Sequence, residues 1–70
     1  MAASYKKLWK LLIDKDLKKK DLISIAEISN YTLNKLTKGE NVTTDILGRI
    51  CKALDCNVED IMEFVENDNK

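Results

Sequence analysis

The 70-residue chain is long enough for one domain and too short for two. It is 44% hydrophobic and 34% charged, a composition typical of soluble globular proteins that argues against global disorder. The formal net charge is zero, but nine lysines against four acids lie in residues 1–38, and eight acids against three basic residues lie in residues 39–70. The first half is therefore basic and the second half acidic, as in proteins with a basic working end.

The first predicted helix follows Ser4, which is a suitable N-cap, and carries apolar residues at helical spacing. The apolar stripe of the first helix is Tyr5, Leu8, Trp9, Leu12 and Ile13. The stretch LKKK at 17–20 then opens a second helix, which carries Leu22, Ile25 and Ala26.

Ser29 stands at the N-cap position of a third helix, and Gly39 follows it where a helix stop is expected. Thr43 or Thr44 caps a fourth helix. The apolar face of the fourth helix is Leu47, Ile50, Cys51 and Leu54.

Asn57, with Asp60 three residues later, predicts the start of a short fifth helix that runs through Ile61, Met62 and Phe64. We therefore predict an all-α, compact bundle of about five short helices. The single domain spans residues 1–70, with a core over about 5–65 and a frayed polar tail over 66–70.

The chemistry-bearing residue types argue against several functional classes. The chain has no histidine, and Cys51 and Cys56 have the spacing of neither a zinc knuckle nor a redox pair. We expect both cysteines to be reduced, Cys51 as a small buried residue. There is no Ser–His or Cys–His pair and no phosphate-binding glycine loop, so we expect no enzyme activity, no cofactor and no metal. No apolar run approaches a membrane span and no signal peptide is visible, so a cytoplasmic location is expected.

The joint between the second and third helices is the most informative feature. The two short helices meet across a turn of about three residues, Glu27, Ile28 and Ser29. That is the layout of a helix-turn-helix, in which the second helix lies in the major groove of DNA and the first crosses the phosphate backbone.

The run LKKKDLISIAEISNYTLNKLTKG resembles the phage Cro and repressor-type (XRE-type) helix-turn-helix family. The segment VTTDILGRICKALDCNVEDIM resembles the fourth and fifth helices of that family, so the likeness covers roughly residues 5–62. It implies a lambda-repressor-like DNA-binding domain with the helix-turn-helix at helices two and three. The residues in register are Leu17, Leu22, Ile28, Ser29, Leu33, Leu36 and Gly39, then Val42, Leu47, Ile50, Ala53, Leu54, Val58 and Ile61.

Some residues depart from the family pattern. Glu27 stands where the family has glycine, at a position that often needs a positive φ. Ile23 replaces a small residue where the helices approach, which implies some repacking. Lys18 and Lys19 replace the usual threonine cap and glutamine. A frequent arginine on helix one and glutamate at the end of helix three are also missing, their places being taken by Leu12 and Thr37.

The third helix, about residues 29–38, is the expected recognition helix. With Leu33 and Leu36 facing inward, the helical period turns several polar side chains outward. Asparagine can pair with adenine, lysine can donate to guanine, and tyrosine can touch a thymine methyl or a phosphate. The family resemblance implies base contacts at Asn30, Tyr31 and Lys35, and a plain polar surface is the alternative. The predicted base contacts are Asn30, Tyr31, Asn34 and Lys35.

Lysine placement supports a phosphate-binding role. Cations near a helix N-terminus oppose the macrodipole, yet lysines stand at the start of both the first and the second helix. Free backbone N–H groups with lysine at a helix start suit a phosphate. Residues that follow the recognition helix are expected to contact the DNA phosphate backbone on the other side of that helix. The predicted phosphate contacts are Lys18, Lys19, Lys20, Ser29, Thr32, Lys38, Asn41, Thr43 and Thr44.

The acidic end has more apolar residues than the final turns of a small domain need. A two-fold interface would explain them, because paired half-sites on DNA require a dimer, but core packing explains them nearly as well. The candidate interface residues are Val58, Met62, Phe64 and Val65. The leading hypothesis is a sequence-specific double-stranded DNA-binding regulator, a repressor that needs no cofactor and forms a homodimer. The alternative is a protein-interaction adaptor or antitoxin-type module on the same scaffold.

Overall fold

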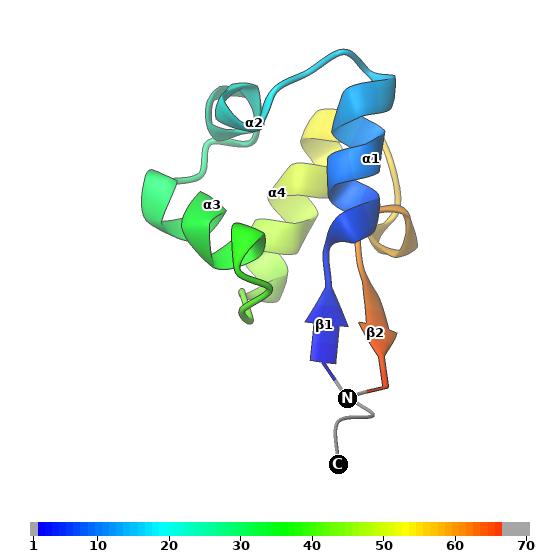
Figure 1. Ribbon diagram of the computed structural model, residues 1–70. Coiled ribbons are helices and arrows are strands. Elements are labelled where there is room, and N and C mark those ends of the chain that lie inside the picture. The colour runs from blue at the N-terminus through cyan, green and yellow to red at the C-terminus, as the bar shows by residue number, and fades with distance from the viewer. Residues whose placement is uncertain (1, 67–70) are drawn as a thin grey trace.

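The computed structural model describes residues 2–66, which form four α-helices, one short 3-10 helix and a two-stranded sheet (Figure 1). The predicted polar tail lies outside the described residues from position 67 onward. In chain order the elements are β1 (Ala2–Ser4), α1 (Lys6–Asp14), α2 (Lys19–Ala26), α3 (Asn30–Thr37), α4 (Thr44–Leu54), η1 (Val58–Asp60) and β2 (Glu63–Val65).

The prediction of a fifth α-helix is wrong. Asn57 N–H does donate to Asp60 Oδ2 at 3.0 Å, as the predicted capping pattern requires, but only the 3-10 turn η1 follows. The chain then extends into β2, which pairs antiparallel with β1 so that Ala3 lies opposite Phe64. Pairing supplies backbone hydrogen bonds to an extended segment rich in strand-forming residues, which local helical spacing does not anticipate. The two ends of the domain therefore lie side by side (Figure 1).

Helix α1 begins one residue later than an N-cap at Ser4 would place it. Ser4 belongs to β1, and α1 starts at Lys6 after Tyr5. The Ser4 hydroxyl still accepts the Lys6 N–H at 3.5 Å. The sheet pairing of β1 thus takes Ser4 out of the capping position that the sequence predicted.

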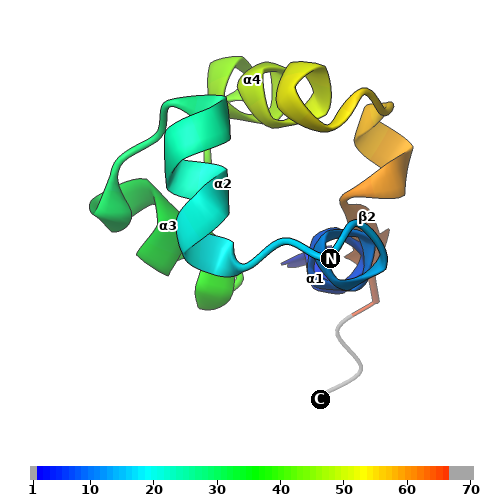
Figure 2. The ribbon, with the colours of Figure 1, turned by 90° about the horizontal axis from the view of Figure 1, so that it is seen from above.

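One apolar core lies between the helices, and among residues 2–66 no charged side chain is buried in it. Seen from above, α1 lies on the opposite side of the domain from α2 and α3, and α4 runs along the top of the view (Figure 2). Helix α2 packs on α4, and η1 packs on both α1 and α4. The buried residues are Tyr5, Leu8, Leu12, Leu22, Ala26, Ile28, Leu33, Leu36, Ile50, Leu54 and Ile61.

Two residues that the helical spacing placed on the core face are exposed. Ile13 is 74% exposed and Ile25 is 43% exposed. Each lies in the last turns of its helix and lines a shallow surface cavity, Ile13 beside Leu17 and Ile25 beside Ala53. On α1, Leu11 packs against the core instead. The prediction of the apolar stripe was therefore wrong at these two positions.

The helix-turn-helix turn has the predicted length. Helix α2 ends at Ala26 and α3 begins at Asn30. Ile28, in the turn, is buried, and Ser29 caps α3 because its Oγ accepts the Thr32 N–H at 3.1 Å. These contacts lock the angle at which α3 leaves α2, so the orientation of α3 is set by a buried side chain and a cap.

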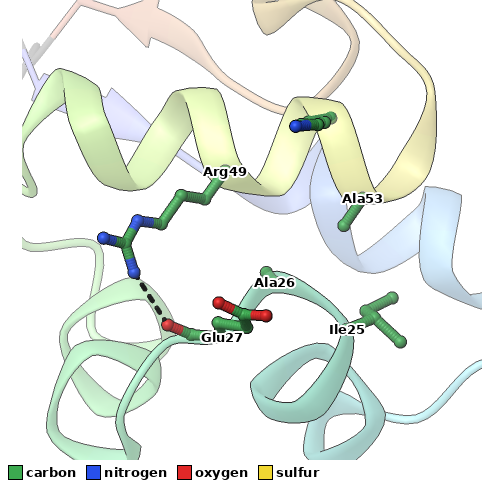
Figure 3. A pocket seen from close by; sticks show the side chains of 6 residues that line it. Ile25, Ala26, Glu27, Arg49 and Ala53 are labelled. Carbon is green, nitrogen blue, oxygen red and sulfur yellow. Dashed lines mark hydrogen bonds between the residues drawn. The ribbon is translucent and has the colours of Figure 1, made fainter.

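Glu27 adopts the left-handed conformation that glycine usually takes, with φ 56° and ψ 49°. Its carbonyl oxygen accepts the Arg49 Nη1–H at 3.0 Å, so α4 holds the turn in place (Figure 3). The positive φ confirms the expectation drawn from the missing glycine, and the backbone strain is kept by the surrounding contacts.

Replacing Glu27 with glycine is expected to raise the free energy of unfolding by about 0.5–1 kcal/mol. A left-handed conformation costs a side-chain-bearing residue about 1–2 kcal/mol, while glycine loses more backbone entropy on folding. Urea denaturation followed by far-UV circular dichroism measures the change. The control is Glu40→Gly at an exposed residue without positive φ, where a loss of a few tenths is expected. Equal effects at the two positions would contradict the strain at Glu27.

The two cysteines meet at the end of α4. Asp55 is left-handed with φ 54°, and the Cys56 N–H donates to the Cys51 oxygen at 3.0 Å, which closes the helix end. Both thiols are free, and Cys51 is partly buried where full burial was expected. Burial raises the pKa of Cys56 to about 11, and the neighbouring Cys51 thiol adds to that rise. Cys56 is therefore a neutral thiol at pH 7.

Candidate nucleic-acid interface

The outer face of α3 presents amide and phenol groups to solvent. Asn30 and Asn34 are exposed, and Tyr31 is 71% exposed. Lys35 is partly buried, and its ammonium lies 5.4 Å from the centroid of the Tyr31 ring. Leu33 and Leu36 hold the opposite face in the core. The predicted base-contact side chains thus share one free face of α3.

A shallow cavity of about 330 Å³ separates this face from the loop after α3. Tyr31, Thr32 and Lys35 line it from α3, and Asn41 and Thr43 line it from the loop. Helix α4 begins beside it, with the Thr43 Oγ1 accepting the Ile46 N–H at 3.3 Å. This side of α3 therefore brings together candidates for base and phosphate contacts.

The loop is held against the N-terminal part of the chain. Val42 is partly buried and packs against the core. Burial raises the pKa of the Tyr5 phenol, and a hydrogen bond with the Val42 backbone partly opposes the rise. The anchored loop gives Asn41 and Thr43 a defined position beside α3.

Three exposed lysines mark the start of α2. Lys18 is the N-cap residue, and Lys19 and Lys20 form the first turn. The Lys18 N–H donates to Asp21 Oδ2 at 2.9 Å, so Asp21 satisfies this backbone group and the lysine side chains take no part in the cap. The Lys19 ammonium lies 4.5 Å from the centroid of the Trp9 ring. A cationic cluster therefore stands where the first helix of the pair would meet the phosphate backbone.

Lys38 lies apart from the loop residues with which the sequence grouped it. It lines a cavity of about 220 Å³ together with Lys6, Ser4 and Trp9, at the start of α1. The cavity next to Asn41 and Thr43 is a different one. The predicted phosphate-contact residues therefore lie on two sides of α3, with Lys38 on the α1 side.

The acidic end carries exposed apolar side chains beside the sheet. Val58 is 44% exposed, Phe64 is 66% exposed and Val65 is 40% exposed, whereas Met62 is partly buried. Lys7 turns toward this end, where its ammonium donates to the Glu59 carbonyl oxygen at 3.1 Å and lies 3.8 Å from Glu63 Oε1. Lys7 is thus engaged within the domain.

Two residues were missed by sequence reasoning. Trp9 was predicted as part of the core stripe, yet its ring also lies under Lys19. Arg49 joins α4 to the turn through the Glu27 carbonyl (Figure 3). The Arg49 Nε also lies 3.1 Å from Asp45 Oδ2. The Asp45–Arg49 pair has i,i+4 spacing and could have been predicted. The contacts from Trp9 and to Glu27 join separate elements and leave no local sequence signal.

The chain is similar to known proteins in both sequence and structure. Residues 7–67 match the family described as the Cro/C1-type helix-turn-helix DNA-binding domain. The crystal structure of the transcriptional regulator VanUg (Form II) superposes with a TM-score of 0.91 and 45% sequence identity, covering 94% of this chain and 88% of that one. No curated protein matches the chain.

The described residues show neither a metal-ligand cluster nor a membrane-length helix. Within residues 2–66, no three His, Cys, Asp or Glu side chains group so that they could hold a metal ion. In the same segment, no helix has the length and apolar character needed to cross a bilayer.

Proposed function

Because the chain belongs to the Cro/C1-type helix-turn-helix DNA-binding domain family, we propose that it recognises a specific double-stranded DNA sequence and represses transcription in the cytoplasm. The observation that carries the proposal is the free polar face of α3, with Asn30, Tyr31, Asn34 and Lys35, in a domain whose α2 opens with three exposed lysines. Direct readout needs such donors and acceptors on an exposed helix, and phosphate contacts need the flanking cations.

In this proposal α3 enters the major groove and the start of α2 meets the phosphate backbone. Asn30 and Asn34 supply amide groups that suit adenine, and Lys35 supplies an ammonium that suits guanine. Lys18, Lys19 and Lys20 contact DNA phosphates on one side of α3. Asn41, Thr43 and Thr44 contact phosphates on its other side. A protein bound at a promoter represses transcription because it excludes the transcription machinery from that site. A catalytic role and a cofactor play no part in this mechanism.

Selection from a random duplex library tests the proposal. The expected result is an enriched motif, bound with an affinity that falls steeply with salt because each neutralised phosphate adds about −0.9 to the log–log slope. A promoter carrying the motif should lose activity in a reporter assay when the protein is present. Absence of enrichment, with no affinity for any duplex at low salt, would reject DNA recognition.

A homodimer is the second part of the proposal. Val58, Phe64 and Val65 are exposed apolar residues of η1 and β2 that a two-fold interface would cover, and a helix-turn-helix protein reads paired half-sites as two copies. A palindromic selected motif would support it.

Phe64→Glu is expected to shift the protein from dimer to monomer in analytical ultracentrifugation. The side chain is 66% exposed, so the folded monomer should tolerate the change, whereas an apolar interface would have to bury the new charge. The control is Ile13→Glu at another exposed apolar residue, on α1, which should leave the dimer intact. A wild-type protein that sediments as a monomer at all concentrations would contradict the dimer.

The alternative function, a protein-interaction adaptor or antitoxin-type module, is favoured by one observation. Exposed Val58 and Phe64 are each next in sequence to an exposed acidic residue, Glu59 and Glu63, and this end of the chain could bind a basic protein surface. A partner that co-purifies with the protein and is released by Phe64→Glu, together with no duplex binding, would replace the DNA-binding proposal.

A further inference from the structure

Trp9 is the single tryptophan of the chain and joins α1 to the start of α2. Its side chain is partly buried and packs against the core, so the ring has a defined position. The Lys19 ammonium lies over the ring at 4.5 Å from the centroid, within the range of a cation–π interaction. A shallow cavity of about 210 Å³, lined by both side chains and by Leu17, opens beside this contact. The tryptophan ring therefore forms a platform for one particular lysine.

An aromatic partner and a carboxylate partner would have different effects on the charge of Lys19. No carboxylate within the described residues 2–66 forms an ion pair with Lys19, and the lysines of α2 stand at a helix end that repels cations. A carboxylate partner would orient the ammonium and cancel its charge. An aromatic face orients the ammonium, leaves its full charge, and leaves N–H donors free on the side away from the ring.

We propose that Trp9 is a positioning residue for DNA binding, which holds the Lys19 ammonium in place for a phosphate of the duplex. The inference rests on the proposed function and assigns a role to a residue that does not itself read the DNA. A free lysine side chain loses rotamer freedom when it contacts a phosphate, and the ring reduces that loss because it restricts the side chain beforehand.

A double-mutant cycle measures the coupling between the two residues. Trp9→Leu is expected to weaken binding to a random-sequence duplex about twofold to fivefold at low salt, the range of an exposed cation–π contact. In a Lys19→Gln background the same change should have almost no effect. The matched control background is Lys20→Gln, where the loss caused by Trp9→Leu should persist. Trp9→Phe, which keeps an aromatic face, should retain most of the affinity.

The tryptophan also gives a signal that needs no DNA. Because Trp9 is the only tryptophan, its fluorescence should change on Lys19→Gln and stay unchanged on Lys20→Gln. Circular dichroism checks that each variant is folded, and Trp9→Met, which also lacks an aromatic face, takes the place of Trp9→Leu in the lysine backgrounds if Trp9→Leu unfolds.

The outcomes separate this inference from the proposed function. If wild-type protein binds the duplex and the loss from Trp9→Leu or Trp9→Met is the same with and without Lys19, Trp9 only supports the fold and the positioning role is wrong. If wild-type protein binds neither the random duplex nor a selected one, the proposed function fails and the positioning role fails with it.

Discussion

Ile50→Ala is expected to lower the free energy of unfolding by about 2–5 kcal/mol, the usual range for truncating a fully buried isoleucine. Ile50 has no exposed surface and lies on α4, the helix that packs against α2. A domain of this size has about 3–5 kcal/mol of stability from its core, so much of the variant should be unfolded at 25 °C. Urea denaturation followed by circular dichroism gives the change.

The matched control is Ile13→Ala, the same chemical change at a side chain that is 74% exposed. Its effect should stay within about 0.5 kcal/mol. A similar loss at the two positions would mean that Ile13 is covered in solution, for example by a second copy of the chain, or that Ile50 is not the centre of the core. Folded Ile50→Ala protein at low temperature should keep its DNA preference, since Ile50 reaches no surface.

Asn30→Ala is expected to weaken binding to the selected duplex by about 1–3 kcal/mol, which is roughly 5-fold to 150-fold in Kd, and to leave binding to random duplex almost unchanged. The amide is exposed on α3, so its removal should take away base contacts without disturbing the core. Fluorescence anisotropy with the two duplexes measures both affinities. Equal losses on selected and random DNA would reject the role of α3 in base readout.

Lys19→Ala provides the opposite pattern. It should weaken binding to both duplexes and reduce the salt slope by about 1, because a phosphate contact carries no sequence information. The matched control is Lys52→Ala, which removes the same charge from an exposed residue in the last turn of α4. That variant should bind both duplexes nearly as well as the wild type. If Lys52→Ala matched Lys19→Ala, net charge rather than a located contact would explain the loss.

Much of the fold could be predicted because its determinants are local. Apolar spacing and the caps at Ser29 and Thr43 predicted α1 to α4 and the length of the turn between α2 and α3. The family resemblance placed Glu27 at a position that often needs a positive φ, with a different turn as the alternative, and Glu27 adopts the positive φ. Each of these features depends on residues within about one or two helical turns, where side-chain spacing and backbone sterics act directly.

The errors arose where distant segments meet. The segment after η1 carries an apolar pattern that is compatible with a helix, and its pairing with β1 decided that it is a strand. Ile13 fits the stripe of α1, yet no element covers it. Lys38 lines a cavity with the start of α1, away from Asn41 and Thr43, and its phosphate contact stays a prediction. Long-range pairing depends on loop paths and on competition between packing partners, which local spacing does not contain.

The candidate site, like the fold, was predicted where local spacing determines it and was not predicted where distant segments meet. Sequence by itself determined which side chains α3 turns away from Leu33 and Leu36, because a helix whose apolar face is buried has only one other face to offer. Only the tertiary structure decided what surrounds that face: the Trp9 ring under Lys19, the Arg49 hydrogen bond to the turn, and the loop at Asn41 and Thr43 beside Tyr31. These contacts join elements that are far apart in the chain, so they exist only once the core has brought the helices together.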